Sequence, residues 1–224
     1  MRRVTIPSLS GLRYMPLVFS FAMLFSGVMI ARAETAADSA LNRGNRPFEE
    51  ARFSLQIVSG ALFSLTNLPE DSPVFNYAQT NLRLGYMLTS PGPQDSFLRG
   101  NWEVLGEITN AIIFEGPGNY IGGITCLFRY NFVQPDWRLI PYVQGGAGIV
   151  YNDAYKEKTQ QAIGQAIEFT PQFSLGCHYL FADNWSVDLE GMFHHISNAN
   201  MAERNRSINA VGGFIGITYH VAHY

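Results

Sequence analysis

The sequence predicts an all-β protein, an eight-stranded antiparallel β-barrel that spans a membrane. Charged residues make up only 15% of the 224 residues, whereas aromatic residues reach 13% and glycine occurs 21 times. Soluble domains carry about 25% charged residues on average. Apolar residues alternate with small or polar ones in eight segments of about ten residues, which is the pattern of a transmembrane barrel.

Residues 1–33 have the features of a secretory signal peptide. Arg2, Arg3 and Arg13 precede an apolar run over residues 15–30, and Ala-Arg-Ala at 31–33 precedes Glu34. A membrane anchor is the alternative, but a spanning helix needs roughly 20 apolar residues and this run is shorter. We expect cleavage after residue 33, a loosely docked polar segment over residues 34–50, and a barrel over residues 51–224.

The first half of the barrel should contain four strands, at residues 52–63, 81–88, 101–114 and 120–131. In the second of these, Leu82, Leu84 and Tyr86 alternate with Asn81 and Arg83. Successive side chains of a strand point to opposite faces. Each segment therefore has one apolar face and one small or polar face.

The second half repeats this pattern at residues 142–151, 169–179, 185–197 and 209–219. In the seventh segment, Val187 and Leu189 alternate with Asp188 and Glu190. Stretches rich in Gly, Pro, Asn and Asp separate the segments, as expected for turns between antiparallel strands.

The charged residues indicate which face points outward. A soluble eight-stranded barrel such as a lipocalin places its apolar side chains inside. Here the charges all fall on the face opposite the aromatic residues: Arg52, Arg83, Arg129, Glu103, Glu107, Asp188 and Glu190. We therefore expect a polar lumen, in which arginines neutralise the carboxylates, and a lipid-facing outer wall with Trp and Tyr near both interfaces. A catalytic acid/base pair is the alternative role of the lumen carboxylates.

Two cysteines, Cys126 and Cys177, lie on the fourth and sixth predicted strands. Two strand spacings correspond to roughly 10 Å, which exceeds the reach of a disulfide. We expect free thiols that face lipid.

The candidate site lies where the seventh and eighth strands meet. His195 and Ser197 share the outward frame of Phe193, and Asn209 shares that of Val211, so all three should lie on the outer wall. With an even strand number both termini lie on the periplasmic side, which makes the 198–208 loop extracellular. Polar groups on a lipid-facing wall are costly and suggest function. The alternative is a set of polar residues tolerated at a strand end. His194 has the opposite parity and should face the lumen.

The motif His195-Ile196-Ser197-Asn198-Ala199, followed by Asn205 and Asn209, resembles the PagL-type lipid A 3-O-deacylases. The Pro141-Tyr142 pair with Gly145, Gly146 and Gly148 is also similar to that family's fifth strand. These motifs cover the C-terminal half of the chain. The resemblance implies a Gram-negative outer-membrane enzyme that releases a 3-hydroxyacyl chain from lipid A.

The resemblance also implies roles for individual residues. Ser197 would be the nucleophile, His195 its base, and Asn198 would help to hold the oxyanion. The family has a glutamate where this chain has Asn209. An asparagine carbonyl can orient a histidine, but it cannot neutralise the imidazolium. Glu203 could replace the glutamate only if its loop folds back.

We therefore expect an esterase without metal or cofactor, located in the outer membrane, with lipid A in the outer leaflet as its partner. The net charge of −3 gives no basic footprint for nucleic acid. A non-catalytic structural or adhesion barrel is the main alternative. A narrow pore is disfavoured because side chains fill so small a barrel. The oligomeric state is left open, a homodimer included.

Overall fold

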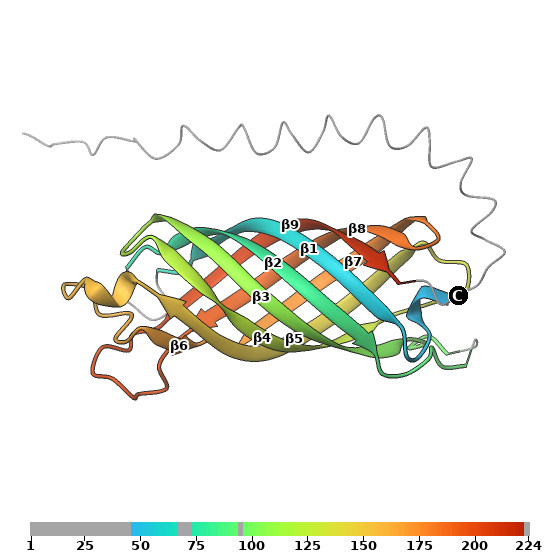
Figure 1. The fold of residues 1–224 in the computed structure, drawn as a ribbon, viewed down its shortest axis with the longest axis horizontal. Helices are drawn as coiled ribbons and strands as arrows, with labels where there is room; N and C mark the ends of the chain where they lie inside the picture. The colour runs from blue at the N-terminus through green and yellow to red at the C-terminus, as the bar shows by residue number, and fades with distance from the viewer. Residues whose placement is uncertain (1–45, 67–72, 94–95, 222–224) are drawn as a thin grey trace, which may run out of the picture. The chain divides into compact units, whose positions relative to one another are not determined.

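The computed structural model describes residues 46–66, 73–93 and 96–221. The predicted signal peptide and most of the 34–50 segment lie outside these residues. The described chain forms an antiparallel barrel (Figure 1). Its strands are β1 (Phe53–Ser64), β2 (Asn76–Met87), β3 (Asn101–Glu115), β4 (Tyr120–Asn131), β5 (Leu139–Asn152), β6 (Ile167–Phe169), β7 (Gln172–Ala182), β8 (Trp185–Ile196) and β9 (Ile208–His220). Two short 3-10 helices are η1 (Arg46–Phe48) and η2 (Ala154–Lys156).

Strands β1 to β5 and β7 to β9 each pair with the next strand of the wall, and β1 pairs with β9 to close it. Because β6 and β7 both pair with β5, they occupy one position, so the wall has the eight positions that the sequence predicted. The predicted sixth strand is interrupted at Thr170 and Pro171. Pro171 has no N–H to donate to the ladder, although its carbonyl oxygen accepts the N–H of His195 at 3.0 Å.

Two strands begin three or more residues earlier than predicted. β2 begins at Asn76 rather than at residue 81, and β5 begins at Leu139 rather than at residue 142. At the start of β2 the inward-facing Tyr77 is apolar and buried, whereas the outward-facing Ala78 and Thr80 are small or polar. Here the inward face is apolar and the outward face is small or polar, the reverse of the rest of the barrel. The sequence pattern therefore does not identify this part of the strand.

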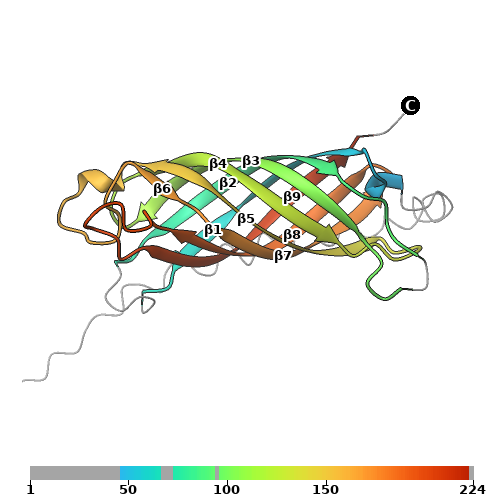
Figure 2. The same cartoon turned by 90° about the horizontal axis from the view of Figure 1, so that it is seen from below.

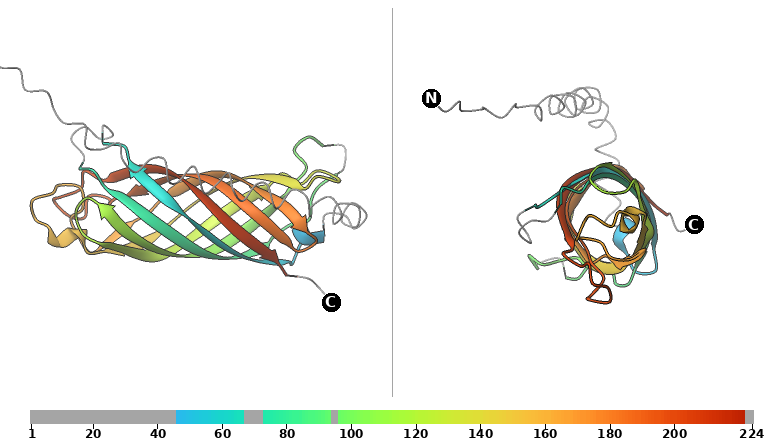
Figure 3. Two further views of the ribbon diagram at one scale, coloured as in Figure 1. Left: turned by 90° about the horizontal axis from the view of Figure 1, so that it is seen from above. Right: turned by 90° about the vertical axis from the view of Figure 1, so that its left-hand side faces the viewer.

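The two rims of the barrel differ in their connections. β1 begins and β9 ends at the rim that also holds η1, which we call the inner rim (Figures 1 and 2). The loops between β5 and β6 and between β8 and β9 lie at the opposite, outer rim. In the end-on view of Figure 3, these loops lie across the outer rim. Among the described residues, no helix is long and apolar enough to cross a membrane.

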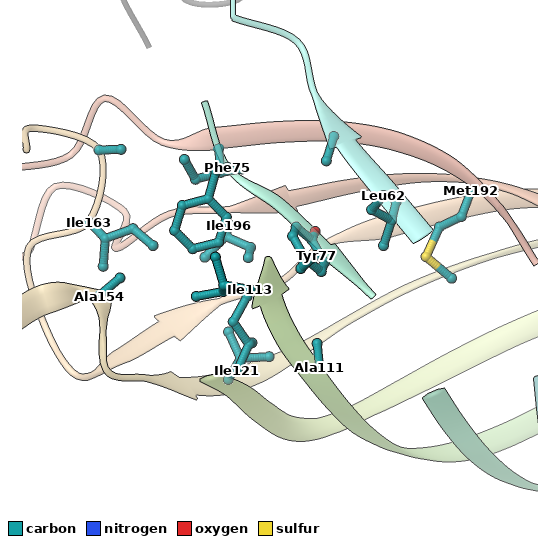
Figure 4. Packing of buried hydrophobic residues seen from close by; sticks show 14 of the residues in the cluster. Leu62, Phe75, Tyr77, Ala111, Ile113, Ile121, Ala154, Ile163, Met192 and Ile196 are labelled. Atoms are coloured by element: carbon teal, nitrogen blue, oxygen red, sulfur yellow. The ribbon is translucent and has the colours of Figure 1, made fainter. Parts of the chain in front are cut away.

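Buried side chains fill the lumen in three levels. Below the outer rim lies an apolar cluster that includes Leu62, Phe75, Ile113 and Ile196 (Figure 4). A polar level follows, and a second apolar cluster closes the inner rim. This filling agrees with the prediction for so narrow a barrel.

The polar level is a network of buried ion pairs. Arg83 contacts Glu107 and Glu190, both at 2.6 Å. Arg129 contacts Glu103 at 3.4 Å. The predicted position of these charges in the lumen is confirmed. Arg52, in contrast, precedes β1 and pairs with Glu49 outside the barrel's polar level.

The inner rim is closed by the segment that precedes β1. Phe48 of η1 is fully buried, and its ring lies 5.0 Å from that of His220. Met87, Val133 and Ile140 complete this cluster. Pro47 and Phe48 are thus buried at the inner rim, whereas the prediction was a loosely docked segment.

The outer wall carries the large exposed apolar side chains, including Leu84, Ile108, Ile124 and Ile215. Exposed aromatic residues gather toward the rims, as Trp102 and Trp185 do at the inner one. Cys126 is exposed, Cys177 is half-buried, and both are free thiols. The prediction of unpaired cysteines on the outer wall is confirmed.

Candidate functional site

The structure brings His195, Ser197 and Asn209 together at the outer rim. His195 lies near the end of β8, Ser197 directly follows that strand, and Asn209 is the second residue of β9. His195 and Asn209 are register partners across the two strands. Directly opposite residues of one sheet face lie close enough to interact, so the β8–β9 pairing itself assembles the site.

The three side chains form a chain of hydrogen bonds. His195 Nε2 lies 2.9 Å from Ser197 Oγ, and His195 Nδ1 lies 2.7 Å from Asn209 Oδ1. Because an amide oxygen can only accept, Nδ1 carries the proton in this arrangement and Nε2 is the acceptor for the serine hydroxyl. All three residues are half-buried on the outward frame. This geometry meets what a serine nucleophile, a histidine base and a group that orients the base require of one another.

The break between β6 and β7 holds Ser197 in place. Ser197 and Phe169 form an isolated antiparallel bridge beyond the end of β8. The Ser197 N–H donates to the Phe169 carbonyl at 3.1 Å, and the Ser197 carbonyl accepts from the Phe169 N–H at 2.7 Å. Both hydrogen-bonding groups of the Ser197 main chain are therefore paired with Phe169, which fixes the residue and pre-organises its hydroxyl toward His195.

A tight turn follows the serine. The Met201 N–H donates to the Asn198 carbonyl at 3.0 Å, and the two central residues have positive φ angles, 51° at Ala199 and 65° at Asn200. Positive φ at both central positions is the type I′ geometry, which favours Gly and Asn. Ala199 thus holds a backbone conformation that an alanine seldom adopts, immediately beside the site.

This strain gives a prediction about stability. Replacing Ala199 with Gly should stabilise the loop by about 1 kcal/mol, because glycine adopts the left-handed region without the steric cost. Ala202→Gly in the same loop is the matched control, since Ala202 does not have a positive φ; there the added chain entropy should destabilise. Rates of proteolysis within residues 198–207 measure both effects, and faster cleavage of the Ala199→Gly protein would contradict the prediction.

Asn198 is fully buried and is engaged within the loop. Its N–H donates to Asn205 Oδ1 at 3.0 Å, and its Nδ2 donates to the Arg204 carbonyl at 2.9 Å. The predicted oxyanion role stays a prediction. This role requires the hydrogen bond from the Asn198 N–H to Asn205 Oδ1 to break, so that the N–H can donate to the substrate oxyanion instead.

The loop is clamped to its neighbour by Arg204, a residue that the sequence did not single out. The guanidinium donates to the carbonyls of Tyr155, Glu157 and Gln160 at 2.8, 2.9 and 3.1 Å. A sequence motif cannot predict this contact, because all three acceptors are main-chain carbonyls, which every residue has. It ties the β8–β9 loop to the β5–β6 loop.

The β5–β6 loop is in turn tied to the β3–β4 turn. Asp153 Oδ1 accepts the N–H groups of Asn119 and Tyr120 at 2.7 and 3.0 Å. Partial burial opposes ionisation of Asp153, but these hydrogen bonds outweigh it and hold the pKa of the carboxyl below its usual range. The outer rim is thus a connected set of loops around the site.

The remaining candidates lie apart from this arrangement. His194 faces the lumen as predicted, where it contacts the Tyr77 hydroxyl at 2.5 Å and the hydroxyl of Thr170. Glu203 is exposed in the loop. Asn209 occupies the place beside His195 Nδ1 that Glu203 would have to reach.

The family described as lipid A 3-O-deacylase (PagL) matches residues 76–218, which is more than half of the chain. The chain belongs to the PagL family. The matched region runs from β2 into β9 and includes His195, Ser197 and Asn209. No curated protein matches the sequence.

Two solved structures share the barrel architecture. The crystal structure of the outer membrane enzyme PagL has a TM-score of 0.51 at 16% identity, over 73% of this chain and 97% of that chain. The crystal structure of Neisserial surface protein A (NspA) also has a TM-score of 0.51, at 12% identity over 75% of this chain and 96% of that chain. At these identities the likeness establishes the fold, a closed outer-membrane barrel of eight wall positions.

Proposed function

We propose that this PagL-family protein is an outer-membrane esterase that hydrolyses the 3-O-linked 3-hydroxyacyl chain of lipid A. The observation that carries the proposal is the hydrogen-bonded series of Ser197, His195 and Asn209 on the outer wall. The family match supplies the substrate class. A lumen site would require the acyl chain to leave the membrane, whereas a site on the wall can meet an ester that remains in the leaflet.

In the first half-reaction Ser197 attacks the ester carbonyl. His195 Nε2, 2.9 Å from Ser197 Oγ, takes the hydroxyl proton as the new C–O bond forms. The tetrahedral intermediate then collapses, and His195 returns the proton to the departing 3-oxygen of the sugar. The products are lipid A with a free 3-hydroxyl and an acyl group on Ser197.

In the second half-reaction water replaces the sugar. His195 takes a proton from the water, which attacks the acyl carbonyl, and then returns a proton to Ser197 Oγ. A 3-hydroxy fatty acid leaves, and the serine is restored. The oxyanion of both intermediates needs donors, for which the Asn198 N–H is the candidate once it is released from Asn205.

Asn209 orients the base in this mechanism but does not neutralise it. Asn209→Ala should lower kcat by about 10- to 100-fold, because the ring of His195 loses its acceptor. Asn209→Glu should raise kcat, because a carboxylate stabilises the imidazolium that forms in the transition state. Initial rates of fatty-acid release measure both changes. Equal rates for the unaltered protein and the two variants would mean that Asn209 has no role in the mechanism.

The length of β8 supports a site at the depth of the outer membrane–water interface. Trp185 begins the strand and Ser197 directly follows it. Twelve residue steps at roughly 3.3 Å, tilted by about 40°, span about 30 Å along the barrel axis, slightly more than the roughly 25 Å apolar band of such barrels. With Trp185 at the inner interface, Ser197 reaches the outer one, where acyl esters of an outer-leaflet lipid lie.

Purified protein incubated with lipid A in detergent micelles tests the proposal. We expect one free 3-hydroxy fatty acid per lipid A molecule and no other fatty acid. Release of no fatty acid, or of a secondary acyl chain, would overturn the proposed activity.

The alternative is a non-catalytic surface barrel. Asn209 in place of the family's glutamate and the fold shared with Neisserial surface protein A favour it. It predicts that every lipid remains unchanged in the presence of the protein. The micelle experiment therefore separates the two functions.

A further inference from the structure

At the inner rim, residues 96–100 of the β2–β3 connection present apolar side chains that nothing in the described chain covers. Phe97 is 88% exposed and Leu98 is 61% exposed. Phe97 is the most exposed of the large apolar side chains in the described residues. We call residues 96–100 the inner-rim segment.

The segment lies on the outside of the barrel. Tyr130 belongs to the outward frame of β4, since its neighbours Arg129 and Asn131 are buried in the lumen. The Tyr130 hydroxyl donates to the Leu98 carbonyl at 2.6 Å. A main-chain atom that accepts from an outward side chain must lie beside the lipid-facing wall, next to the Trp102 ring that packs on Tyr130 at 5.0 Å.

The carbonyl groups of the segment are also satisfied within the protein. Phe97 O accepts from Gln134 Nε2 at 2.9 Å, and Arg99 O accepts from the Val133 N–H at 2.9 Å. Ser96 O accepts from the Arg99 N–H at 3.0 Å. With the bond to Leu98, four consecutive carbonyls therefore have partners. Irregular backbone in a membrane needs partners within the protein for its polar groups, and these four acceptors have them.

We propose that the inner-rim segment is a membrane anchor, which inserts Phe97 and Leu98 into the lipid leaflet at the rim opposite the site. The exposed side chains continue the apolar outer wall, so the occupant is the phospholipid that already surrounds that wall. Trp137 is also exposed, at 51%, in the β4–β5 connection whose Gln134 donates to the Phe97 carbonyl. The anchor would fix the depth of the barrel independently of any enzymatic activity.

Single-tryptophan fluorescence tests the anchor in the full mature chain. The native tryptophans Trp102, Trp137 and Trp185 are replaced by phenylalanine, and one reporter is introduced per protein, Phe97→Trp or Leu98→Trp. Leu84→Trp, on the outer wall, serves as the lipid-embedded control. Thr159→Trp, in the exposed β5–β6 loop, serves as the aqueous control. Circular dichroism verifies that every variant folds in phosphatidylcholine vesicles.

We expect both reporters to be quenched by phosphatidylcholine brominated on its acyl chains, as Leu84→Trp is. Acrylamide quenching should be about fivefold weaker than for Thr159→Trp, because an interfacial side chain sits below the headgroups. Quenching by acrylamide as strong as that of Thr159→Trp, without quenching by brominated lipid, would overturn the anchor. That result would instead indicate a surface open to a periplasmic protein.

Discussion

Replacing Ser197, the proposed nucleophile, with Ala should lower kcat for the proposed deacylation of lipid A by at least about 10⁴-fold, because only the binding and oxyanion contributions would remain. The hydroxyl lost is the group that lies 2.9 Å from His195 Nε2. Release of 3-hydroxy fatty acid from lipid A micelles measures the effect. The barrel itself should keep its stability, since the Ser197 side chain has no part in the buried lumen network.

Ser59→Ala is the matched control. Ser59 is likewise a serine on the outer wall; it is exposed, and its hydroxyl lies 2.8 Å from that of Thr80. This substitution should leave the rate unchanged. If the Ser197→Ala protein kept the rate of the unaltered protein, a different group would have to be the nucleophile.

Replacing Arg83 with Met should lower the free energy of unfolding by about 3–5 kcal/mol, because it leaves buried carboxylates without their partner. Arg83 is fully buried and contacts Glu107, Glu190 and Gln56. Urea unfolding in lipid vesicles, followed by circular dichroism, measures the change. Glu107→Gln and Glu190→Gln, added together, should restore part of the loss, since they remove the uncompensated charges.

Arg52→Met is the control for that measurement. Arg52 pairs with Glu49 at 3.4 Å outside the polar level, and exposed pairs contribute less than about 1 kcal/mol. A loss for Arg83→Met no larger than that for Arg52→Met would mean that the lumen network does not stabilise the barrel.

The barrel could be predicted from the sequence because its two faces are chemically distinct. Lipid requires apolar side chains at every second residue, and a narrow lumen can hold charges only if they are paired. The positions of Asp188, Glu190 and Arg83 in the sequence therefore identify which side chains of each strand face the lumen. The same parity placed His195 and Ser197 on the outer wall, and the register confirmed that Asn209 lies opposite His195.

What the sequence could not predict depends on main-chain contacts and on local reversals of the pattern. Below the outer rim the lumen is apolar, so inward-facing Tyr77 and Phe75 masked the start of β2. The Arg204 clamp uses only carbonyl acceptors, which every residue has. The burial of Phe48 at the inner rim and the engagement of Asn198 with Asn205 are tertiary contacts without a local signature.

The mass spectrum of lipid A from outer membranes tests the central claim most directly. Cells that express the protein should contain lipid A that lacks one 3-hydroxyacyl chain at a 3-position, whereas cells that express the Ser197→Ala protein at the same level should retain it. Identical lipid A in the two strains would contradict the assignment of a lipid A deacylase with Ser197 as its nucleophile.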